Sequence, residues 1–379
     1  QLPIAAAGVV FALYSILFMF GGVMRLGFDN ALVRFVGKNP VSMLVYLTDA
    51  YKAVFPLCLI VSAVCFFFSE SISSLILPSA TSKEFQSIAI MLPLIVFSFL
   101  NAYALQGIGK PGASVTIINV VVPLWITCCV LLADAISISE VINYMISALV
   151  VAASMSAYSV LKSQGFKHFS SSESEPDYFK AAKGMFLVQL STLAIQWSGP
   201  IIAGGLLSSE EAAQFFVIQR VALLIGFALI AINVVAAPKI SRLYAEGDNE
   251  GMARYLAKTG RWIQFCGFPI FLLLMMYPGV LLSLFGSDYE AAANVMRIVA
   301  IGQYINMSSG SVGWVLQMTG RERVLRNNLL LSLMTLVVAS FTLAPLYGIY
   351  GLAIGLAVSV SLQNLIGVWY VKREFGINM

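Results

Sequence analysis

Residues 212–238 read AAQFFVIQRVALLIGFALIAINVVAAP. This stretch holds one charged residue, Arg220, and about 20 apolar residues in an α-helix are enough to cross the hydrocarbon core of a bilayer. The stretch therefore predicts a membrane-spanning helix. Arg220 follows Ala212 by eight residues, so at about 1.5 Å per residue it is expected about 12 Å inside the outer boundary, close to mid-membrane.

Ten further apolar runs of similar length lie on either side of this stretch. They are continuous and end in Gly, Pro or charged residues, unlike the alternating segments of a membrane β-barrel. The 379 residues are 59% hydrophobic and 11% charged, whereas soluble domains have about 45–50% and about 25%. The predicted fold class is an all-α polytopic membrane protein with eleven transmembrane helices. The predicted spans are 3–24, 53–77, 86–107, 113–133, 140–161, 184–207, 212–238, 262–285, 291–319, 327–347 and 349–371.

The basic residues predict the orientation of these helices. One set of connections carries 19 of the 22 Lys and Arg residues, the alternate set carries Lys83 and Arg297, and Arg220 lies within a span. Because cytoplasmic loops are enriched in Lys and Arg, the first set and the C-terminus are predicted to be cytoplasmic. The outer connections are all short. An odd number of spans puts Gln1 outside, so we expect one further helix before it.

A polar stretch and an internal repeat predict the domain organisation. Residues 163–178, SQGFKHFSSSESEPDY, read as a cytoplasmic linker. It separates a five-helix N-terminal bundle (1–162) from a six-helix C-terminal bundle (179–379). Residues 98–110, SFLNAYALQGIGK, align with 309–321, SGSVGWVLQMTGR, at an offset of 211. Two halves in the same orientation predict pseudo-symmetric bundles around a central cavity, with a binding site between them, an architecture typical of transporters.

Sequence motifs for catalysis are missing. The single histidine, His168, lies in the predicted linker, and no Gly-rich phosphate loop, H-E-x-x-H or G-x-S-x-G sequence is present. The Lys and Arg residues flank membrane spans and build no nucleic-acid surface. We therefore predict no enzyme activity, no cofactor, no metal and no nucleic-acid partner. The five cysteines lack ligand spacing and are interpreted as small core residues: Cys58, Cys65, Cys128, Cys129 and Cys266.

Polar residues inside the spans are the candidate substrate contacts, because ionisable groups at membrane depth normally face a cavity or a partner. For Arg220 three roles remain open: binding of a substrate anion, a structural ion pair, or snorkelling to the interface. Polar residues also recur at helical spacing on two spans. They are Gln189, Thr192, Gln196 and Gly199 on the sixth span, and Gln303, Asn306, Gly310, Gly313 and Gln317 on the ninth.

These two polar faces have competing interpretations. For Gln189, Thr192 and Gln196, interhelical hydrogen bonding and contact with sugars in a lumen explain the pattern equally well. For the face with Gln303 and Asn306, close helix packing through its glycines is the favoured explanation.

Several charged residues at the span ends have structural explanations. An ion pair is expected between Arg25 and Asp29, which are one helical turn apart. Arg297 is expected to snorkel to the membrane interface. Lys180 and Lys183 are expected to meet anionic headgroups.

Three segments resemble a known family. They are GGVMRLGFDNALVRFVG (21–37), EEAAQFFVIQRVALLIGFALIAINVVAAPKISRLYAEGD (210–248) and LLSLFGSDYEAAANVMRIVAIGQYINMSSGSVGWVLQMTGR (281–321). Together they look like the polysaccharide, or O-antigen, flippase family of the multidrug/oligosaccharidyl-lipid/polysaccharide exporter superfamily. The resemblance covers essentially the whole chain.

The resemblance implies a fold and a function. Its members have two six-helix bundles, so the visible spans are helices two to twelve and the first helix is missing. They move undecaprenyl-diphosphate-linked glycan units across the bacterial inner membrane. The expected partners are the lipid-linked oligosaccharide, membrane lipids and a polysaccharide polymerase machinery. Arg220 matches a basic cavity residue of the eighth helix, and Gln189 and Gln196 lie on the seventh, which borders the cavity.

Two other classes of function stay open. A multidrug antiporter of the same superfamily needs a buried carboxylate, whereas the acidic residues lie at predicted span ends. An integral-membrane glycan-modifying enzyme needs a sizeable outer loop, whereas the predicted outer loops are short. The acidic residues at the span ends are Asp29, Asp49, Asp134, Glu140 and Glu290.

Overall fold

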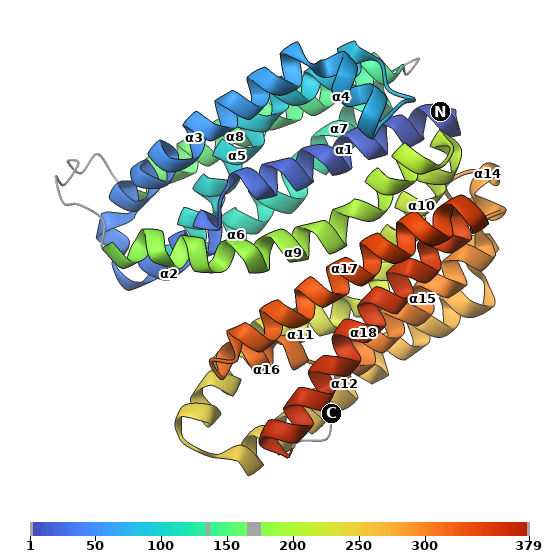
Figure 1. Cartoon of the computed structure of the whole chain (residues 1–379). Helices are drawn as coiled ribbons and strands as arrows, with labels where there is room; N and C mark the ends of the chain where they lie inside the picture. The colour runs from blue at the N-terminus through green and yellow to red at the C-terminus, as the bar shows by residue number, and fades with distance from the viewer. Residues whose placement is uncertain (1–2, 134–136, 165–175, 377–379) are drawn as a thin grey trace. The chain divides into compact units, whose positions relative to one another are not determined.

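The computed structural model describes residues 3–133, 137–164 and 176–376, so His168 and Asp134 lie outside the described residues. The described residues form helices and no strands (Figure 1). Ten helices among them are long and apolar enough to cross a membrane. The all-α, multi-pass membrane fold predicted from the sequence is therefore confirmed. The chain divides into two compact units, Gln1–Gly205 (unit 1) and Leu206–Met379 (unit 2).

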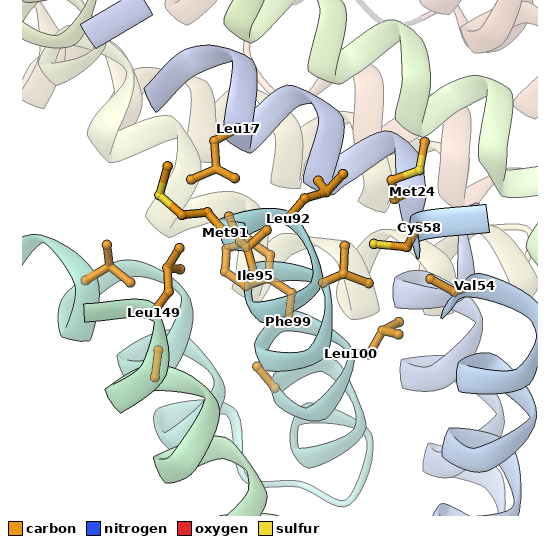
Figure 2. Close-up of a cluster of buried hydrophobic side chains, with 14 of the residues drawn as sticks. Leu17, Met24, Val54, Cys58, Met91, Leu92, Ile95, Phe99, Leu100 and Leu149 are labelled. Carbon is orange, nitrogen blue, oxygen red and sulfur yellow. The ribbon is translucent and has the colours of Figure 1, made fainter. Parts of the chain in front are cut away.

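Unit 1 is built around α5, which packs against α1, α2, α3 and α8. Its elements are α1 (Ile4–Met24), α2 (Phe28–Lys38), η1 (Pro40–Ser42), α3 (Met43–Phe67), α4 (Ser69–Ile76), α5 (Ser82–Gly107), α6 (Pro111–Val115), the π-helical η2 (Thr116–Val121), α7 (Val122–Leu132), α8 (Ile138–Gln164) and α9 (Pro176–Leu206). Figure 2 shows the core around α5, where Leu17 of α1, Cys58 of α3 and Leu149 of α8 surround Leu92 and Phe99. All five side chains are buried.

Unit 2 is built around α15 in the same way, because α15 packs against α10, η3, α12 and α18. Its elements are α10 (Ser209–Ala222), the 3-10 helix η3 (Leu223–Gly226), α11 (Phe227–Ala245), α12 (Asn249–Met276), α13 (Pro278–Ser283), α14 (Ser287–Glu290), α15 (Ala293–Ser308), α16 (Val312–Met318), α17 (Glu322–Tyr347) and α18 (Ile349–Phe375).

The internal repeat is confirmed by the helix bounds. Adding 211 to the bounds of α8 gives those of α18, and adding 211 to the bounds of α5 gives Ala293–Met318, which are the bounds of α15 and α16 together. The turns that follow also correspond. Gly109 and Gly320 both have positive φ, +83° and +74°. Equivalent backbone hydrogen bonds also form in the two turns. The N–H of Lys110 donates to the backbone oxygen of Leu105 (3.0 Å), and the N–H of Arg321 donates to that of Leu316 (2.8 Å). This hydrogen-bond pattern is typical of a Schellman motif at a helix C-terminus.

The ninth predicted span, 291–319, is two helices rather than one. The chain breaks between α15 and α16, where Gly310 has φ +63°. A glycine adopts this left-handed conformation without the steric cost that a side chain brings. Apolar residues continue on both sides of the break, so hydropathy alone predicted one continuous span.

Two helices begin earlier than the predicted spans at 53–77 and 262–285. They are α3, which begins at Met43, and α12, which begins at Asn249. Their first turns carry charged side chains such as Lys52 and Lys258, both exposed. Charged residues end an apolar run without ending a helix, because Lys and Arg are good helix formers.

The helix α9 packs with unit 1. Tyr178 is buried and its hydroxyl donates to the backbone oxygen of Tyr46 in α3 at 3.0 Å. At the other end, a Cβ on Gly204 would lie 2.7 Å from Leu77 and 3.2 Å from Ala12. Most of the predicted linker, 163–178, lies outside the described residues, so the sequence domains 1–162 and 179–379 remain a prediction.

The five cysteines have different environments. Cys58 and Cys65 are buried in α3, but Cys128 in α7 and Cys266 in α12 are exposed, and Cys129 is partly exposed. The prediction that all five are core residues was therefore wrong. Lipid tails are as apolar as leucine, so an apolar run does not reveal which face of the helix meets the core.

Candidate functional site

Arg220 lies in the last turn of α10, immediately before the chain tightens into η3. The candidate membrane span here is Ser209–Asn233. Arg220 comes eleven residues after its start and thirteen before its end, near the middle, as predicted from the sequence. A cation in the last turn of a helix interacts favourably with the helix dipole, and a 3-10 stretch inside a longer helix often marks a functional hinge.

The surroundings of Arg220 combine an aromatic ring with buried neighbours. The side chain is partly buried, and its guanidinium carbon lies 5.1 Å from the centre of the Phe216 ring, within the range of a cation–π interaction. Gln219 is 8% exposed and Ala222 is fully buried. Arg220 therefore lies on the boundary between the core of unit 2 and a more accessible face of α10.

The start of α10 is fixed by polar contacts within unit 2. Ser208 and Glu211 form a capping box, and the second carboxylate oxygen of Glu211 accepts the backbone N–H of Ile349 in α18 at 3.2 Å. The Gln214 side chain donates to the backbone oxygen of Asp288 in α14 at 2.8 Å. These contacts hold α10 against its neighbours, about two turns before Arg220.

Gln303 and Asn306 lie on α15, which packs against α10 and η3. Gln303 is buried, Asn306 is partly buried, and the amide of Asn306 donates to that of Gln303 at 3.5 Å. The structure therefore brings these two predicted site residues together.

The expected close packing through Gly310 and Gly313 was wrong. A Cβ at either glycine would meet no atom within 4 Å. Close packing on α15 occurs at Gly302 instead, where a Cβ would lie 2.8 Å from the Cα of Ala357 in α18. The spacing of the glycines predicted that they share one face of a helix. It could not predict whether another helix packs against that face.

The polar residues of α9 lie beside the face that packs in unit 1. Leu193 contacts the Gly22 position of α1, and the Trp197 ring lies 5.1 Å from the ring of Phe18. On the adjoining face, Thr192 and Gln196 are exposed and Gln189 is partly buried. The α9 residues belong to unit 1, and Arg220, Gln303 and Asn306 belong to unit 2. A shared cavity between these groups remains a prediction.

The predicted ion pair between Arg25 and Asp29 is confirmed, with a distance of 3.3 Å between Nε and Oδ2. Arg25 is 3% exposed and Asp29 is 1% exposed, and among the residues whose burial the structure describes they are the only charged ones that are buried. The guanidinium carbon of Arg25 lies 4.7 Å from the centre of the Phe99 ring. The sequence did not predict this burial, because the aromatic ring that covers Arg25 belongs to Phe99 of α5.

A sharp bend joins α1 and α2 at this ion pair. Leu26 has φ +51° and Gly27 has φ +79°. A Cβ on Gly27 would lie 2.3 Å from the backbone oxygen of Ala182 in α9. A glycine is therefore required at the bend by both its conformation and its close contact.

Arg297 caps the C-terminal end of α12, and its snorkelling to the membrane interface remains a prediction. Its Nε donates to the backbone oxygen of Met275, in the last turn of α12, at 3.0 Å, and its Nη1 donates to the side-chain oxygen of Asn294. Basic side chains near a helix C-terminus commonly satisfy its free carbonyl groups. Lys180 and Lys183, in the first turns of α9, are exposed.

Comparison with known proteins identifies the relatives of this chain. Residues 184–342 match the MatE family. The chain is 25% identical over 178 residues to the capsular polysaccharide biosynthesis protein CapF of Staphylococcus aureus, which is 46% of this chain and 44% of CapF. The aligned part thus spans less than half of that relative.

Solved transporter structures share the fold. An inward-facing multidrug resistance MATE family transporter of the MOP superfamily superimposes with a TM-score of 0.77 at 14% identity, covering 98% of this chain and 90% of the other. The lipid II flippase MurJ, in an inward closed conformation, superimposes with a TM-score of 0.69 at 13% identity, covering 96% and 86%. Residues 184–342 therefore resemble the MatE family, and the chain shares the fold of these solved transporters.

Proposed function

We propose that this protein is a transporter that moves undecaprenyl-diphosphate-linked glycan units across the bacterial inner membrane by alternating access. The observation that carries the proposal is Arg220, an arginine at the middle of an apolar span. Two comparisons support the choice of substrate: the partial similarity to a protein named for capsular polysaccharide biosynthesis and the fold shared with a lipid II flippase.

The chemistry of Arg220 suits a diphosphate. A guanidinium group at this depth is costly unless it faces a partner or water, and its planar fork of donors matches phosphate oxygens. The contacts of Glu211 and Gln214 fix the helix that carries it. Gln303 and Asn306 in unit 2, and Gln189, Thr192 and Gln196 in unit 1, would bind sugar hydroxyls as the two units change their arrangement.

Alternating access separates the two parts of such a substrate. The glycan and diphosphate would pass through hydrated space, which avoids the cost of moving unpaired hydroxyl groups through hydrocarbon. The polyprenyl chain would remain in lipid. Both arrangements of the protein must lie within a few kcal/mol of each other to be populated.

Multidrug transport is the alternative, and Asp29 is the observation that favours it. An antiporter needs a buried carboxylate to couple transport to an ion, and Asp29 is buried. Its Oδ2 is paired with Arg25, however, and its Oδ1 accepts the backbone N–H of Asn30 at 3.0 Å. In our proposal this carboxylate is structural.

The test is mass spectrometry of lipids that co-purify with the protein from cells making a lipid-linked glycan. We expect a polyprenyl-diphosphate glycan to co-purify with the wild type, and at least about tenfold less with Arg220→Gln, since a hydrogen bond to a charged group contributes about 1.5–3 kcal/mol. Lys180→Gln, which removes an exposed charge, should leave the yield unchanged. Absence of the glycan, together with binding of an organic cation that Asp29→Asn abolishes, would support the multidrug alternative instead.

A further inference from the structure

The first half of α12 presents cations and aromatic rings on one face. Lys258, Arg261, Trp262 and Phe265 are spaced by three or four residues, so they lie on one side of the helix. Together they line an open hollow of about 530 Å³. Trp262 is 56% exposed and Phe265 is 73% exposed. The two rings meet edge to face, with 6.2 Å between their centres.

This face lies at the end of unit 2 where basic residues gather. Met252 and Leu256 of α12 share a core cluster with Val371 of α18, so the start of α12 lies beside the end of α18 (Figure 1). On α18, Trp369 precedes Lys372 and Arg373 in the chain, whereas on α12 the two cations precede the aromatic residues. The opposite order is expected for antiparallel helices that cross one membrane interface.

The remainder of α12 supports the same placement. Beyond Phe265, the exposed large side chains are apolar: Phe268, Leu272, Leu273 and Met276. Along one helix the exposed surface therefore changes from cations to aromatic rings and then to apolar side chains. That order matches the change from lipid headgroups, through the interface, to hydrocarbon.

The described residues do not neutralise the cations of this face. In the part of the chain that the structure describes, neither Lys258 nor Arg261 forms an ion pair. The Nε of Arg261 donates to the backbone oxygen of Ala257 at 3.3 Å, which orients the guanidinium beside the hollow. The acidic residue that precedes Lys258 on α12, Glu250, is two turns away.

We propose that this face of α12 is a binding site for an anionic phospholipid. The phosphate would lie between Lys258 and Arg261, because an ammonium and a guanidinium group are the usual protein partners of phosphate. Trp262 would lie at the level of the ester groups and Phe265 would contact the acyl chains. Two unpaired cations favour a headgroup with net negative charge over a zwitterionic one. This site is separate from Arg220 and does not depend on the proposed transport function.

The test uses the full chain in lipid nanodiscs and the fluorescence of Trp262, obtained as the difference between wild type and Trp262→Phe. Brominated phosphatidylglycerol and brominated phosphatidylcholine, which quench tryptophan on contact, serve as probes at equal density. A Lys or Arg near an anionic surface strengthens lipid attraction about fivefold. We expect phosphatidylglycerol to be enriched at Trp262 at least about fivefold, and the enrichment to disappear in Lys258→Gln/Arg261→Gln.

The matched control is Lys372→Gln/Arg373→Gln, which removes two cations from the same end of unit 2. It should retain the enrichment at Trp262, as should the charge-preserving Lys258→Arg/Arg261→Lys. Single neutral variants should each lose part of it, which gives a second measurement if the double variant does not purify as a folded protein. Equal loss in both neutral double variants would indicate general attraction to the surface and overturn the site. Equal quenching of the wild type by the two lipids would also overturn it.

Discussion

Arg220 is a charged residue near the middle of an apolar span. If it binds a diphosphate, charge matters more than shape. Arg220→Lys should therefore retain part of the transport, whereas Arg220→Ala and Arg220→Gln should reduce it at least about tenfold, since a hydrogen bond to a charged group contributes about 1.5–3 kcal/mol. The measurement is glycan display in cells lacking their own flippase, normalised to the amount of protein in the membrane.

A structural role for Arg220 predicts a different result. The neutral variants would then lower the amount of folded protein, and removing a partner carboxylate as well would restore it. Full glycan display with Arg220→Ala would exclude Arg220 from the mechanism.

The ion pair between Arg25 and Asp29 should be important for stability because it is buried. Arg25→Ala leaves a buried carboxylate without its partner, a change that costs about 3–5 kcal/mol. The double variant Arg25→Met/Asp29→Leu should recover most of that loss. Thermal unfolding in detergent measures both effects.

The matched control for this pair is Lys52→Ala. Lys52 pairs with Asp49 at 3.4 Å, but its side chain is 74% exposed, so the loss should stay below about 1 kcal/mol. A loss in Arg25→Ala no larger than that in Lys52→Ala would contradict the structural role.

Local spacing predicted the residue pairs but not their surroundings. Arg25 and Asp29 are one turn apart, so their contact follows from the helix alone. Their burial depends on Phe99, which is distant in the sequence. The position of Arg297 in the sequence likewise gave no indication that it caps α12. Its partner, the backbone oxygen of Met275, lies on a different helix.

The break between α15 and α16 gives a test at the scale of an element. Gly310 and Gly313 both have open space where the Cβ of an alanine would lie, but only Gly310 has positive φ. Gly310→Ala should destabilise the protein by about 1–2 kcal/mol, because an L side chain is strained there. Gly313→Ala, within α16, should be neutral or stabilising by up to about 1 kcal/mol, because alanine favours the helix. Thermal unfolding of the two variants side by side would reveal the difference, and equal effects would mean that the helix is continuous.

Helix existence could be predicted from the sequence because apolar runs of bilayer length have few alternatives. Helix ends were less predictable. The start of α12 at Asn249 carries Arg254, Lys258 and Arg261, which suit a helix but not hydrocarbon. Hydropathy therefore located the part of each helix that lies in lipid, rather than the whole helix.

At the scale of the whole molecule, the internal repeat predicts how the helices of the two halves correspond, which no single span can predict. Five identities or charge matches near residues 98–110 and 309–321 predicted the offset of 211. The structure extends that offset to α8 and α18, whose sequences differ but whose bounds correspond. The helix bounds thus correspond in a region where the sequences differ. How the polar residues of α9 relate to Arg220 could not be predicted from the sequence, because they belong to different units.

The distribution of charge gives the last prediction, which concerns orientation in the membrane. With 19 of the 22 Lys and Arg residues on one set of connections, the positive-inside rule predicts that this set is cytoplasmic. A cysteine introduced within 163–178 should be protected from a membrane-impermeant maleimide in intact cells, whereas one introduced at Ser209 should react. Both should react after the membrane is opened, which controls for accessibility. Five spans would separate the first residue from the 163–178 connection, and one span, α9, separates that connection from Ser209. Labelling of both positions from the same side would therefore mean that α9 does not cross the membrane, and the assignment of Arg220 to mid-membrane would be lost with it.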